Sequence, residues 1–425
     1  MSDHLNNREF TVRSAALVAS ATLGIACSGG TLPLYTLGVL VGPLQAAFQA
    51  SAAAIQTVWF ACSMLAAVLA PLVGFAVDRW GARPVAMVGL LGVALGFVSL
   101  GLLPQSLTGF YAYAALLTVL ASGSSPITWS RGLARNFMRN RGLALGLGLS
   151  GSGLAGAFAP VYAAWLVDGY GWRGAYVGLA LLPLCIALPW GFLFFRPTGQ
   201  EQDNREQDDR EDKETAQRTA LPPPSAAPLI GLIKTRAFAI LFFVFLTVSI
   251  GVGGLIPNFV PILMERGLDR LEAASIAGLI GLSVIAGRVG TGLLMDRFWA
   301  AGVLCTAFML PATACLLLSQ ADVSSSIYYI GAICIGLAAG AEFDGAAFLI
   351  AKYFPMRNFG RLYGILFAGI SATAGSGPAL LAWLAERWGG YSPVLLLVAG
   401  VFIVGALPLL LLGGQRYAAN EFSKK

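Results

Sequence analysis

Apolar runs of about 20 residues recur along the whole chain and are separated by short polar segments. Twelve of them can be placed, with centres near residues 30, 65, 94, 122, 154, 185, 248, 284, 309, 340, 373 and 403. Each run is long enough to cross a hydrocarbon core of about 30 Å as an α-helix. The pattern therefore predicts an all-α membrane protein whose twelve transmembrane helices are embedded in a lipid bilayer.

One polar stretch interrupts these runs near the middle of the chain. Residues 200–228 combine the segment EQDNREQDDREDKE with LPPPSAAP, a composition that cannot bury a hydrophobic core. We expect three parts: an N-terminal six-helix bundle over residues 1–199, a charged cytoplasmic linker over 200–228, and a C-terminal six-helix bundle over 229–425.

The two halves are related by a single shift of 218 residues. The shift superimposes these residues of the first half, with the counterpart of each in parentheses: Gly74 (Gly292), Asp78 (Asp296), Arg79 (Arg297), Gly146 (Gly364) and Pro160 (Pro378). Two repeated six-span halves are typical of transporters, whose substrate site lies between the halves near the middle of the bilayer. We therefore expect two pseudo-symmetric bundles.

The distribution of basic residues predicts how the chain is oriented. Twelve crossings place both ends on one side, where fifteen Arg and Lys residues of the tails and short loops fall, against four on the other side. Because basic residues favour the cytoplasmic side, we expect both termini there, in a multi-pass protein of the inner (plasma) membrane. The net charge of +6 then reflects the membrane topology, so we expect no nucleic-acid partner. We also expect the protein to be a monomer.

Several kinds of chemistry are excluded by composition. The six Cys residues are scattered singly in the apolar runs, and the one His is His4. Histidine metal sites and Ser-His or Cys-His nucleophile pairs therefore lack their parts. We expect no enzyme activity, no cofactor and no metal.

Three charged residues lie in the middle of apolar runs: Arg288, Glu342 and Asp344. Inserting one charged residue at the centre of a membrane-spanning helix costs roughly 2.5–3.5 kcal/mol, so we expect these three residues to have a function. The 218-residue shift places them on uncharged positions: Ala70, Ser124 and Pro126. Charges that occur in only one half of the repeat favour a binding site over a structural ion network. The guanidinium group of Arg288 matches the geometry of a carboxylate, so we expect the substrate to be a small organic anion. The alternative is a permanent ion pair between Arg288 and one of the acids.

The two acids differ in their helical positions. Asp344 shares a helix face with Gly336 and Gly340, where close packing against another helix is expected, and Glu342 lies on a different face. Apolar surroundings favour the protonated form of a carboxyl group, so either acid could carry a coupling proton. We expect Glu342 to do so, with Asp344 as the alternative.

Few other polar residues occur within the spans. Candidate substrate contacts are Tyr35, Ser125, Thr128, Thr247, Asn258 and Ser371. Each has a structural alternative, because a buried hydroxyl often bonds its own helix backbone. Trp59 and Trp129 are either aromatic walls or packing residues. The scarcity of amides argues against a sugar carrier.

The loop GFAVDRWGARP after the second span resembles the signature of the major facilitator superfamily, and GLLMDRF after the eighth span resembles its repeat. The resemblance implies a gating motif that consists of Gly74, Asp78, Arg79, Arg83, Asp296 and Arg297. It also implies that Gly74 allows close helix contact, that Asp78 lies near a helix N-terminus, and that Arg79 and Arg83 contact neighbouring loops.

A narrower resemblance is to the bacterial monocarboxylate and oxalate/formate antiporter branch. It rests on AGRVGTGLLMDR, NFMRNRGLALGLGLSGSGLAG and GAEFDGAAFLIAKYFPMRNFGRLYG, and it implies that Arg288 binds substrate. Two departures are that Val284 stands where animal members have an Asp, and that their lysine on the first span is missing. A proton route would therefore differ from the animal pattern.

These observations together predict a secondary active transporter of small organic anions. We expect monocarboxylate:proton symport by alternating access, in which ion gradients supply the energy. The alternative is a proton-coupled drug or metabolite exporter. The fifth span, GLGLSGSGLAGAFAP, has the glycines of such exporters but lacks their Gly-Pro pair, which favours the anion carrier.

Overall fold

The computed structural model describes residues 12–102, 104–137, 141–196, 229–320, 324–355 and 358–413. In these residues every regular element is a helix. The first half contains α1 (Val12–Ala26), α2 (Thr31–Phe48), α3 (Ala52–Trp80), α4 (Ala82–Leu102), α5 (Leu107–Ala121), α6 (Pro126–Asn136), α7 (Arg141–Leu149), α8 (Gly151–Leu182) and α9 (Leu188–Phe194). The second half contains α11 (Leu229–Ile233), α12 (Arg236–Glu265), α13 (Arg270–Arg297), α14 (Ala300–Leu318), α15 (Ser325–Tyr353), α16 (Phe359–Trp388) and α17 (Tyr391–Ala406).

Eleven helical stretches of the described residues are long and apolar enough to span a membrane, and one of them contains two crossings. That stretch, Leu143–Phe194, has 52 residues, or about 78 Å as a straight helix, far more than one bilayer needs. The backbone leaves the helical conformation at Gly171, with φ of 68°. The Tyr162 hydroxyl also donates to the Gly178 carbonyl at 3.2 Å, which requires the chain to reverse between them. The twelve spans predicted from the sequence are thus accounted for.

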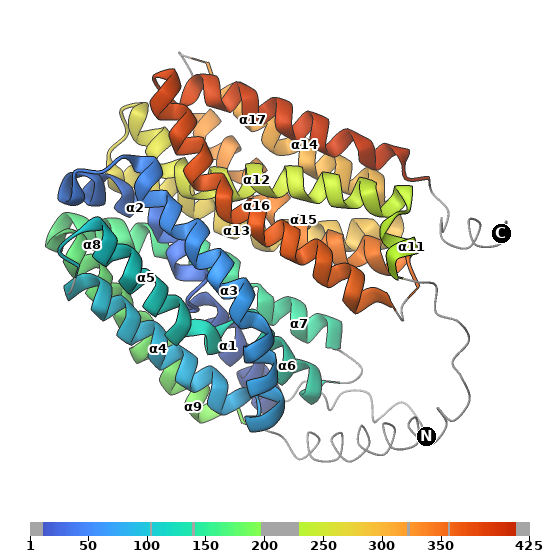
Figure 1. Cartoon of the computed structure of the whole chain (residues 1–425), viewed down its shortest axis with the longest axis horizontal. Coiled ribbons are helices and arrows are strands. Elements are labelled where there is room, and N and C mark those ends of the chain that lie inside the picture. The colour runs from blue at the N-terminus through green and yellow to red at the C-terminus, as the bar shows by residue number, and fades with distance from the viewer. Residues whose placement is uncertain are drawn as a thin grey trace.

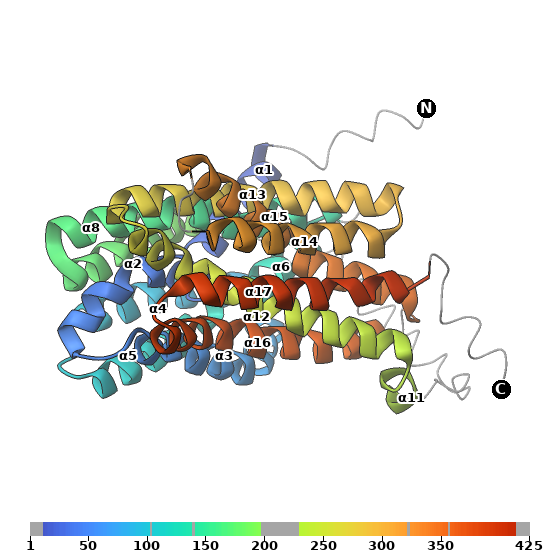
Figure 2. The same cartoon turned by 90° about the horizontal axis from the view of Figure 1, so that it is seen from above.

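The helices form two bundles, with α1–α9 in one and α11–α17 in the other (Figure 1). We call the end of the molecule where α1 begins and α17 ends the proximal end, and the opposite end the distal end (Figures 1 and 2). The expected linker, residues 200–228, lies outside the described residues.

The two bundles contact each other through three helix pairs: α3 with α16, α8 with α13, and α2 with α12. Towards the distal end these helices touch through glycines. A Cβ at Gly281 would lie 2.2 Å from the backbone nitrogen of Ala157, and one at Gly38 would lie 2.1 Å from the Pro257 carbonyl oxygen. Towards the proximal end, glycines of the same helices or their continuations have no atom within 4 Å of a Cβ position: Gly74, Gly146, Gly292 and Gly364. The bundles are therefore closed distally and separated proximally.

Two spans of the N-terminal bundle are broken near their middle. The first span is interrupted between α1 and α2, and the fourth between α5 and α6. The two breaks contact each other, because the Gly29 amide donates to the Ser124 hydroxyl oxygen at 3.2 Å. Irregular backbone at membrane depth is tolerated where it is buried in protein or lines a cavity, and transporter sites are often built from such discontinuous helices.

Candidate functional site

Arg288 on α13 and Asp344 on α15 form an ion pair within the C-terminal bundle. The guanidinium Nε lies 2.9 Å from Asp344 Oδ2, with side-chain exposures of 13% for the arginine and 34% for the aspartate. Asp344 thus neutralises Arg288 in this conformation, as the structural alternative anticipated. The pair leaves the guanidinium incompletely satisfied, because Nη1 is buried and has no hydrogen-bond partner in the described chain.

Close packing of α13 against α15 positions this pair. A Cβ at Gly340 would lie 2.2 Å from the Val284 carbonyl oxygen and 2.8 Å from the Arg288 amide nitrogen. A Cβ at Gly287 would meet the Leu337 backbone at 2.4 Å. The small residues bring the two backbones together, so that Arg288 and Asp344 meet one turn further along. This is the helix face that the sequence indicated for Asp344.

Glu342 lies on another face of α15 and contacts α12 instead. Its side chain is 3% exposed, and its Oε1 is hydrogen-bonded to the Ser249 hydroxyl. Ser249 Oγ also lies 2.5 Å from the Phe245 carbonyl oxygen. A serine hydroxyl has one proton and cannot donate to both oxygens. A protonated Glu342 that donates to Ser249, while Ser249 donates to Phe245, satisfies all three groups.

Tyrosines from both bundles lie close to the charged group. Tyr35 on α2 is buried, lies within electrostatic range of Arg288, and packs against Gly156. Tyr363 on α16 lies within electrostatic range of Arg288, Asp344 and Glu342. Sequence reasoning selected Tyr35 and missed Tyr363, because a tyrosine in an apolar span looks like a packing residue.

The spacing of aromatic residues on α16 was the signal for Tyr363. Its ring stacks on Phe359, with centroids 5.6 Å apart and planes 9° apart, and it contacts Phe367 at 6.0 Å. These residues recur every four positions and so share one helix face. Tyr363 therefore belongs to an aromatic face of α16, which a lone polar residue would not reveal.

Ser125 and Thr128 lie at the break in the fourth span, in the bundle opposite Arg288. Ser125 precedes α6 without capping it through its side chain, and Thr128 follows in the first turn. Both hydroxyl oxygens are buried and have no hydrogen-bond partner in the described residues. Unsatisfied buried hydroxyls are uncommon in folded proteins, so both residues remain candidate contacts for a polar solute.

Two of the residues predicted to contact substrate have other roles in this conformation. The Asn258 side chain is fully buried: it accepts from Gln56 at 2.8 Å and Tyr391 at 2.6 Å, and it donates to two backbone carbonyls. It therefore joins the bundles distally instead of lining a cavity. The Thr247 hydroxyl donates to its own helix, at Phe243, and its methyl group packs beside Gly405 of α17.

The remaining candidates, Ser371 and Trp129, differ in how deeply they are buried. Ser371 on α16 is half-buried. Trp129 is fully buried, donates from its indole to the Ser124 carbonyl at 3.0 Å, and fills the space beside Gly24, so it is a packing residue. No group of three or more His, Cys, Asp or Glu among the described residues is placed to hold a metal ion.

The gating motif makes its contacts within the N-terminal bundle. Asp78 pairs with Arg131 of α6, and Arg131 also donates to the Gly74 carbonyl at 3.2 Å. Arg83 donates to the Phe192 carbonyl at 2.8 Å, near the C-terminal end of α9, where a positive charge is favourable. Gly74 has no atom within 4 Å of its Cβ position, so the close helix contact implied for it is not formed in this conformation.

Both copies of the motif have exposed residues. Arg79 of the first copy and Asp296 and Arg297 of the second copy all lie on the surface of the proximal end. The two copies of the motif therefore lie apart, one on each bundle.

Comparison with known proteins agrees with this architecture. Residues 15–347 match the Major Facilitator Superfamily. The chain belongs to this family, and it is a multi-pass membrane transporter and not an enzyme.

Within the superfamily, its homologues are transporters of the monocarboxylate type. The chain is 29% identical to monocarboxylate transporter 11 of Mus musculus, over 88% of this chain and 83% of the relative. It is 30% identical to monocarboxylate transporter 13 of Rattus norvegicus, over 89% and 84%. It is 27% identical to monocarboxylate transporter 6 of Mus musculus, over 91% and 83%. The resemblance to the monocarboxylate branch is thereby confirmed.

Proposed function

We propose that this protein carries small monocarboxylates together with protons by alternating access, as a monomer in the inner membrane with both termini in the cytoplasm. The observation that carries the proposal is the Arg288–Asp344 pair. It is a partly exposed ion pair in the middle of two spans, and it leaves guanidinium Nη1 buried without an acceptor. A substrate carboxylate supplies the missing acceptor, since a guanidinium binds carboxylates through two parallel hydrogen bonds.

Charge balance links the anion to a proton. The Arg288–Asp344 pair is neutral, so an added carboxylate leaves one uncompensated negative charge inside the membrane, which is costly. A proton on Asp344 removes that charge and releases the guanidinium for the substrate. Anion and proton are then bound in a ratio of one to one.

Asp344 suits this exchange better than Glu342. Asp344 is 34% exposed and already contacts the arginine, so a proton and a substrate can both reach it. Glu342 is 3% exposed, and its hydrogen bonds with Ser249 are complete if it keeps its proton. We therefore propose Asp344 as the coupling acid and Glu342 as a permanently protonated residue that joins α15 to α12.

The N-terminal bundle contributes a favourable field for an anion. Helix α2 begins at Thr31, inside the first span, and Tyr35 one turn later lies within electrostatic range of Arg288. The N-terminus of a helix carries a partial positive charge, and half-helices in transporters direct it at anionic groups. Substrate between Arg288 and this turn would contact both bundles.

The glycine contacts support alternating access. Gly74 and Gly292 are related by the repeat, as are Gly146 and Gly364, and all four face open space at the proximal end. Distal glycines at the same bundle interface are packed against backbone. If the proximal ends closed as the distal ends do here, these glycines would allow the close approach. This conformation is then the inward-facing one.

A thermal-shift assay on the purified protein tests the substrate class. The ligands are lactate, oxalate and benzoate, each compared with its neutral amide: lactamide, oxamide and benzamide. We expect at least one acid to stabilise the protein while its amide does not, because Arg288 recognises the charged carboxylate. Equal effects of acid and amide, or stabilisation only by the lipophilic cation tetraphenylphosphonium, would contradict the proposal and favour the exporter.

A further inference from the structure

Two acidic residues at the distal end are related by the shift of 218 residues. Asp168 of α8 maps onto Glu386 of α16. Each lies three residues before a glycine of positive φ at which the helical conformation ends: Gly171, with φ of 68°, and Gly389, with φ of 77°. The repeat therefore preserves a carboxyl group at this position together with the local fold, whereas the charges of the anion site occur in one half alone.

The helix N-termini beside these acids are repeated as well. Helix α3 follows Ser51 and α13 follows Asp269, and the same shift superimposes these two residues. Both side chains cap their own helix. Ser51 Oγ accepts from the Ala54 amide at 3.1 Å, and Asp269 Oδ1 accepts from the Glu272 amide at 2.8 Å. The distal end thus has two equivalent helix N-termini, one in each bundle.

Each acid contacts the helix N-terminus of the opposite bundle. Glu386 of the C-terminal bundle accepts from the Ala53 amide in the first turn of α3, at 3.1 Å. Asp168 of the N-terminal bundle forms an ion pair with Arg270, the first residue of α13. A carboxylate is favourable at both places, because a helix N-terminus and a guanidinium are positive. Each bundle therefore holds the other through one ionised carboxyl group.

The charged groups near Glu386 have partners of their own. Arg387, the next residue, lies over the Trp383 ring at 5.3 Å. Glu265 of α12 accepts from the Tyr391 amide at 3.0 Å, so it caps α17 within its own bundle. The Tyr391 hydroxyl lies within electrostatic range of both acids. The inter-bundle contact of Glu386 is thus with the N-terminus of α3.

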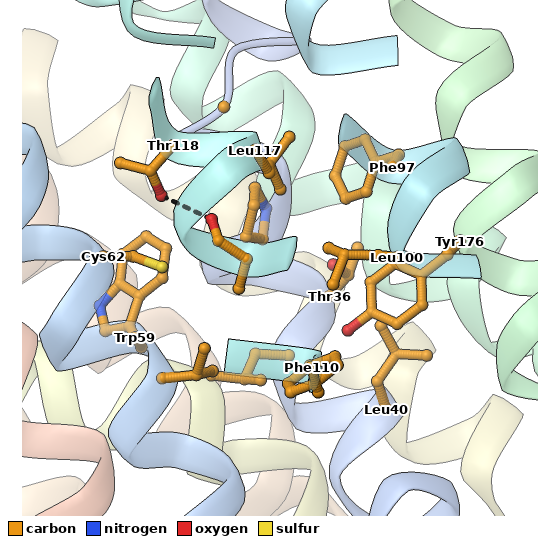
Figure 3. Close-up of a pocket in the computed structure, with 15 residues that line it drawn as sticks. Thr36, Leu40, Trp59, Cys62, Phe97, Leu100, Phe110, Leu117, Thr118 and Tyr176 are labelled. Atoms are coloured by element: carbon orange, nitrogen blue, oxygen red, sulfur yellow. Dashed lines mark hydrogen bonds between the residues drawn. The ribbon is translucent and has the colours of Figure 1, made fainter. Parts of the chain in front are cut away.

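The surroundings of Asp168 and of α3 complete this picture. Arg173 of α8 donates to carbonyls at the C-terminal end of α4. The first turn of α13 also contains the acid Glu272 beside Arg270. On the side of α3 that faces its own bundle, the small space beside Trp59 is lined by uncharged residues (Figure 3). The inter-bundle ion pair of Asp168 is therefore with Arg270.

Both acids can be reached from the distal side, because Asp168 is 47% exposed and Glu386 is exposed. The closed conformation contacts their ionised forms, so protonation from that side weakens both contacts. We propose that Asp168 and Glu386 form a paired latch, which closes the distal end and is released by protons on the distal side. The latch rests on the alternating access of the proposed function. It is separate from the anion site, because Arg270 lies 18 residues before Arg288 on α13, about 27 Å along the helix.

Distances between two spin labels test the latch, measured by double electron–electron resonance on the full chain in nanodiscs without substrate. The labels are attached through Thr108→Cys and Ser326→Cys, which the repeat relates and which lie exposed in the first turns of α5 and α15. The background lacks the partly exposed cysteines Cys62, Cys185 and Cys334. The short distance reports the distally closed state, and a longer distance reports the open state.

Replacing the acids by their amides should open the distal end. Asp168→Asn and Glu386→Gln are each expected to raise the ratio of open to closed molecules about threefold, and together about tenfold, because the two contacts are separate. Lowering the pH from about 7 to about 4, into the ordinary titration range of carboxyl groups, should open the wild type similarly. The double variant should not respond to this change of pH.

Asp269→Asn is the matched control, because it removes a negative charge one residue from Arg270 while asparagine still caps α13. It should behave like the wild type. Asp168→Arg combined with Arg270→Asp reverses the ion pair and should restore the closed state. Equal ratios in the double variant and the wild type, an equal effect of Asp269→Asn, or a double variant that still opens in acid would overturn the proposal. Because no substrate is present, failure of the carboxylate proposal in the thermal-shift assay would leave this result unchanged.

Discussion

At the scale of single residues, the two acids of α15 have different partners although only one residue separates them. Asp344 contacts Arg288 of α13 and remains partly exposed, whereas Glu342 contacts Ser249 of α12 and is buried. The sequence offered an ion pair and a substrate-binding arginine as alternatives. The geometry makes them compatible, since a pair that is incompletely satisfied and partly exposed can exchange one carboxylate for another.

The first prediction separates the roles of the two acids. Asp344→Asn should keep exchange of labelled substrate across the proteoliposome membrane but lose accumulation driven by a pH gradient. The asparagine is neutral, so Arg288 is available to the substrate without any proton being bound at residue 344. Glu342→Gln should keep both activities, because the amide can donate to Ser249 as a protonated carboxyl does. Uptake with and without an imposed pH gradient measures the difference.

The outcome that contradicts this assignment is equally clear. If Glu342→Gln loses pH-driven accumulation and Asp344→Asn retains it, the coupling proton is carried by Glu342, as the sequence alone suggested. Reconstituted amounts of each variant must be matched by immunoblot, so that lost accumulation is not lost protein.

At the scale of helices, the site depends on how closely α13 and α15 approach. Gly340→Ala places a methyl group 2.2 Å from the Val284 carbonyl oxygen, so the helices must separate. We expect a loss of stability of about 1–3 kcal/mol, which is usual for overpacking, and a weaker Arg288–Asp344 pair. Thermal unfolding and substrate affinity measure the two effects.

Gly290→Ala is the control for that substitution. Gly290 is on α13, and no atom lies within 4 Å of its Cβ position. Alanine there should be neutral or slightly stabilising, because it favours the helix. Equal destabilisation by both substitutions would show that helix contact at Gly340 is not what positions the site.

The helices themselves were predictable, but their orientation was less so. Twelve spans follow from apolar length, because each run of about 20 residues is long enough to cross the bilayer as a helix. The breaks at Gly29 and Ser124 were missed, since both lie in apolar runs and are stabilised by contact with each other. Thr247 and Asn258 were predicted as cavity residues, whereas in this conformation Thr247 packs beside Gly405 and Asn258 bonds Gln56. An isolated polar position in the sequence does not reveal which neighbour its helix face meets.

At the scale of the whole molecule, polar contacts between the bundles close the distal end. Gln56 donates to Asn258 at 2.8 Å, and the Ala53 amide donates to the Glu386 carboxylate at 3.1 Å. Asp168 and Arg270 form an ion pair near the same end. Hydrogen bonds and ion pairs of this kind are individually weak in net terms, so the closure is suited to opening.

Removing one of these bonds should favour the opposite conformation. Gln56→Leu is expected to raise the population of the distally open state about fivefold, the equivalent of one hydrogen bond. Ser63, which packs beside Gly375 across the interface, reports the opening as Ser63→Cys. Its labelling by a maleimide should accelerate by the same factor.

Thr57→Val is the control for that prediction, because the Thr57 hydroxyl donates to the Ala53 carbonyl of its own helix. Labelling should be unchanged in this variant. The measurement requires a background without the partly exposed cysteines Cys62, Cys185 and Cys334. Equal labelling in Gln56→Leu and Thr57→Val would mean that the Gln56–Asn258 bond does not hold the distal end closed.

The repeat of 218 residues indicated two bundles, and the structure has them (Figure 1). The substrate site between them stays a prediction. The sequence did not indicate which end is closed, because Gly74 and its counterparts serve one conformation and the distal glycines serve the other. Both sets are present in every state. The conformation is therefore a property of the assembled chain that no single motif contains.

The most direct test of the account is uptake of a labelled carboxylate, selected by the thermal-shift assay, into proteoliposomes that contain wild-type or Arg288→Ala protein. We predict that the variant is folded and reconstituted, as shown by its unfolding transition, and that its saturable uptake falls to the level of empty liposomes. Near-normal saturable uptake by Arg288→Ala would contradict the claim that this guanidinium binds the transported acid.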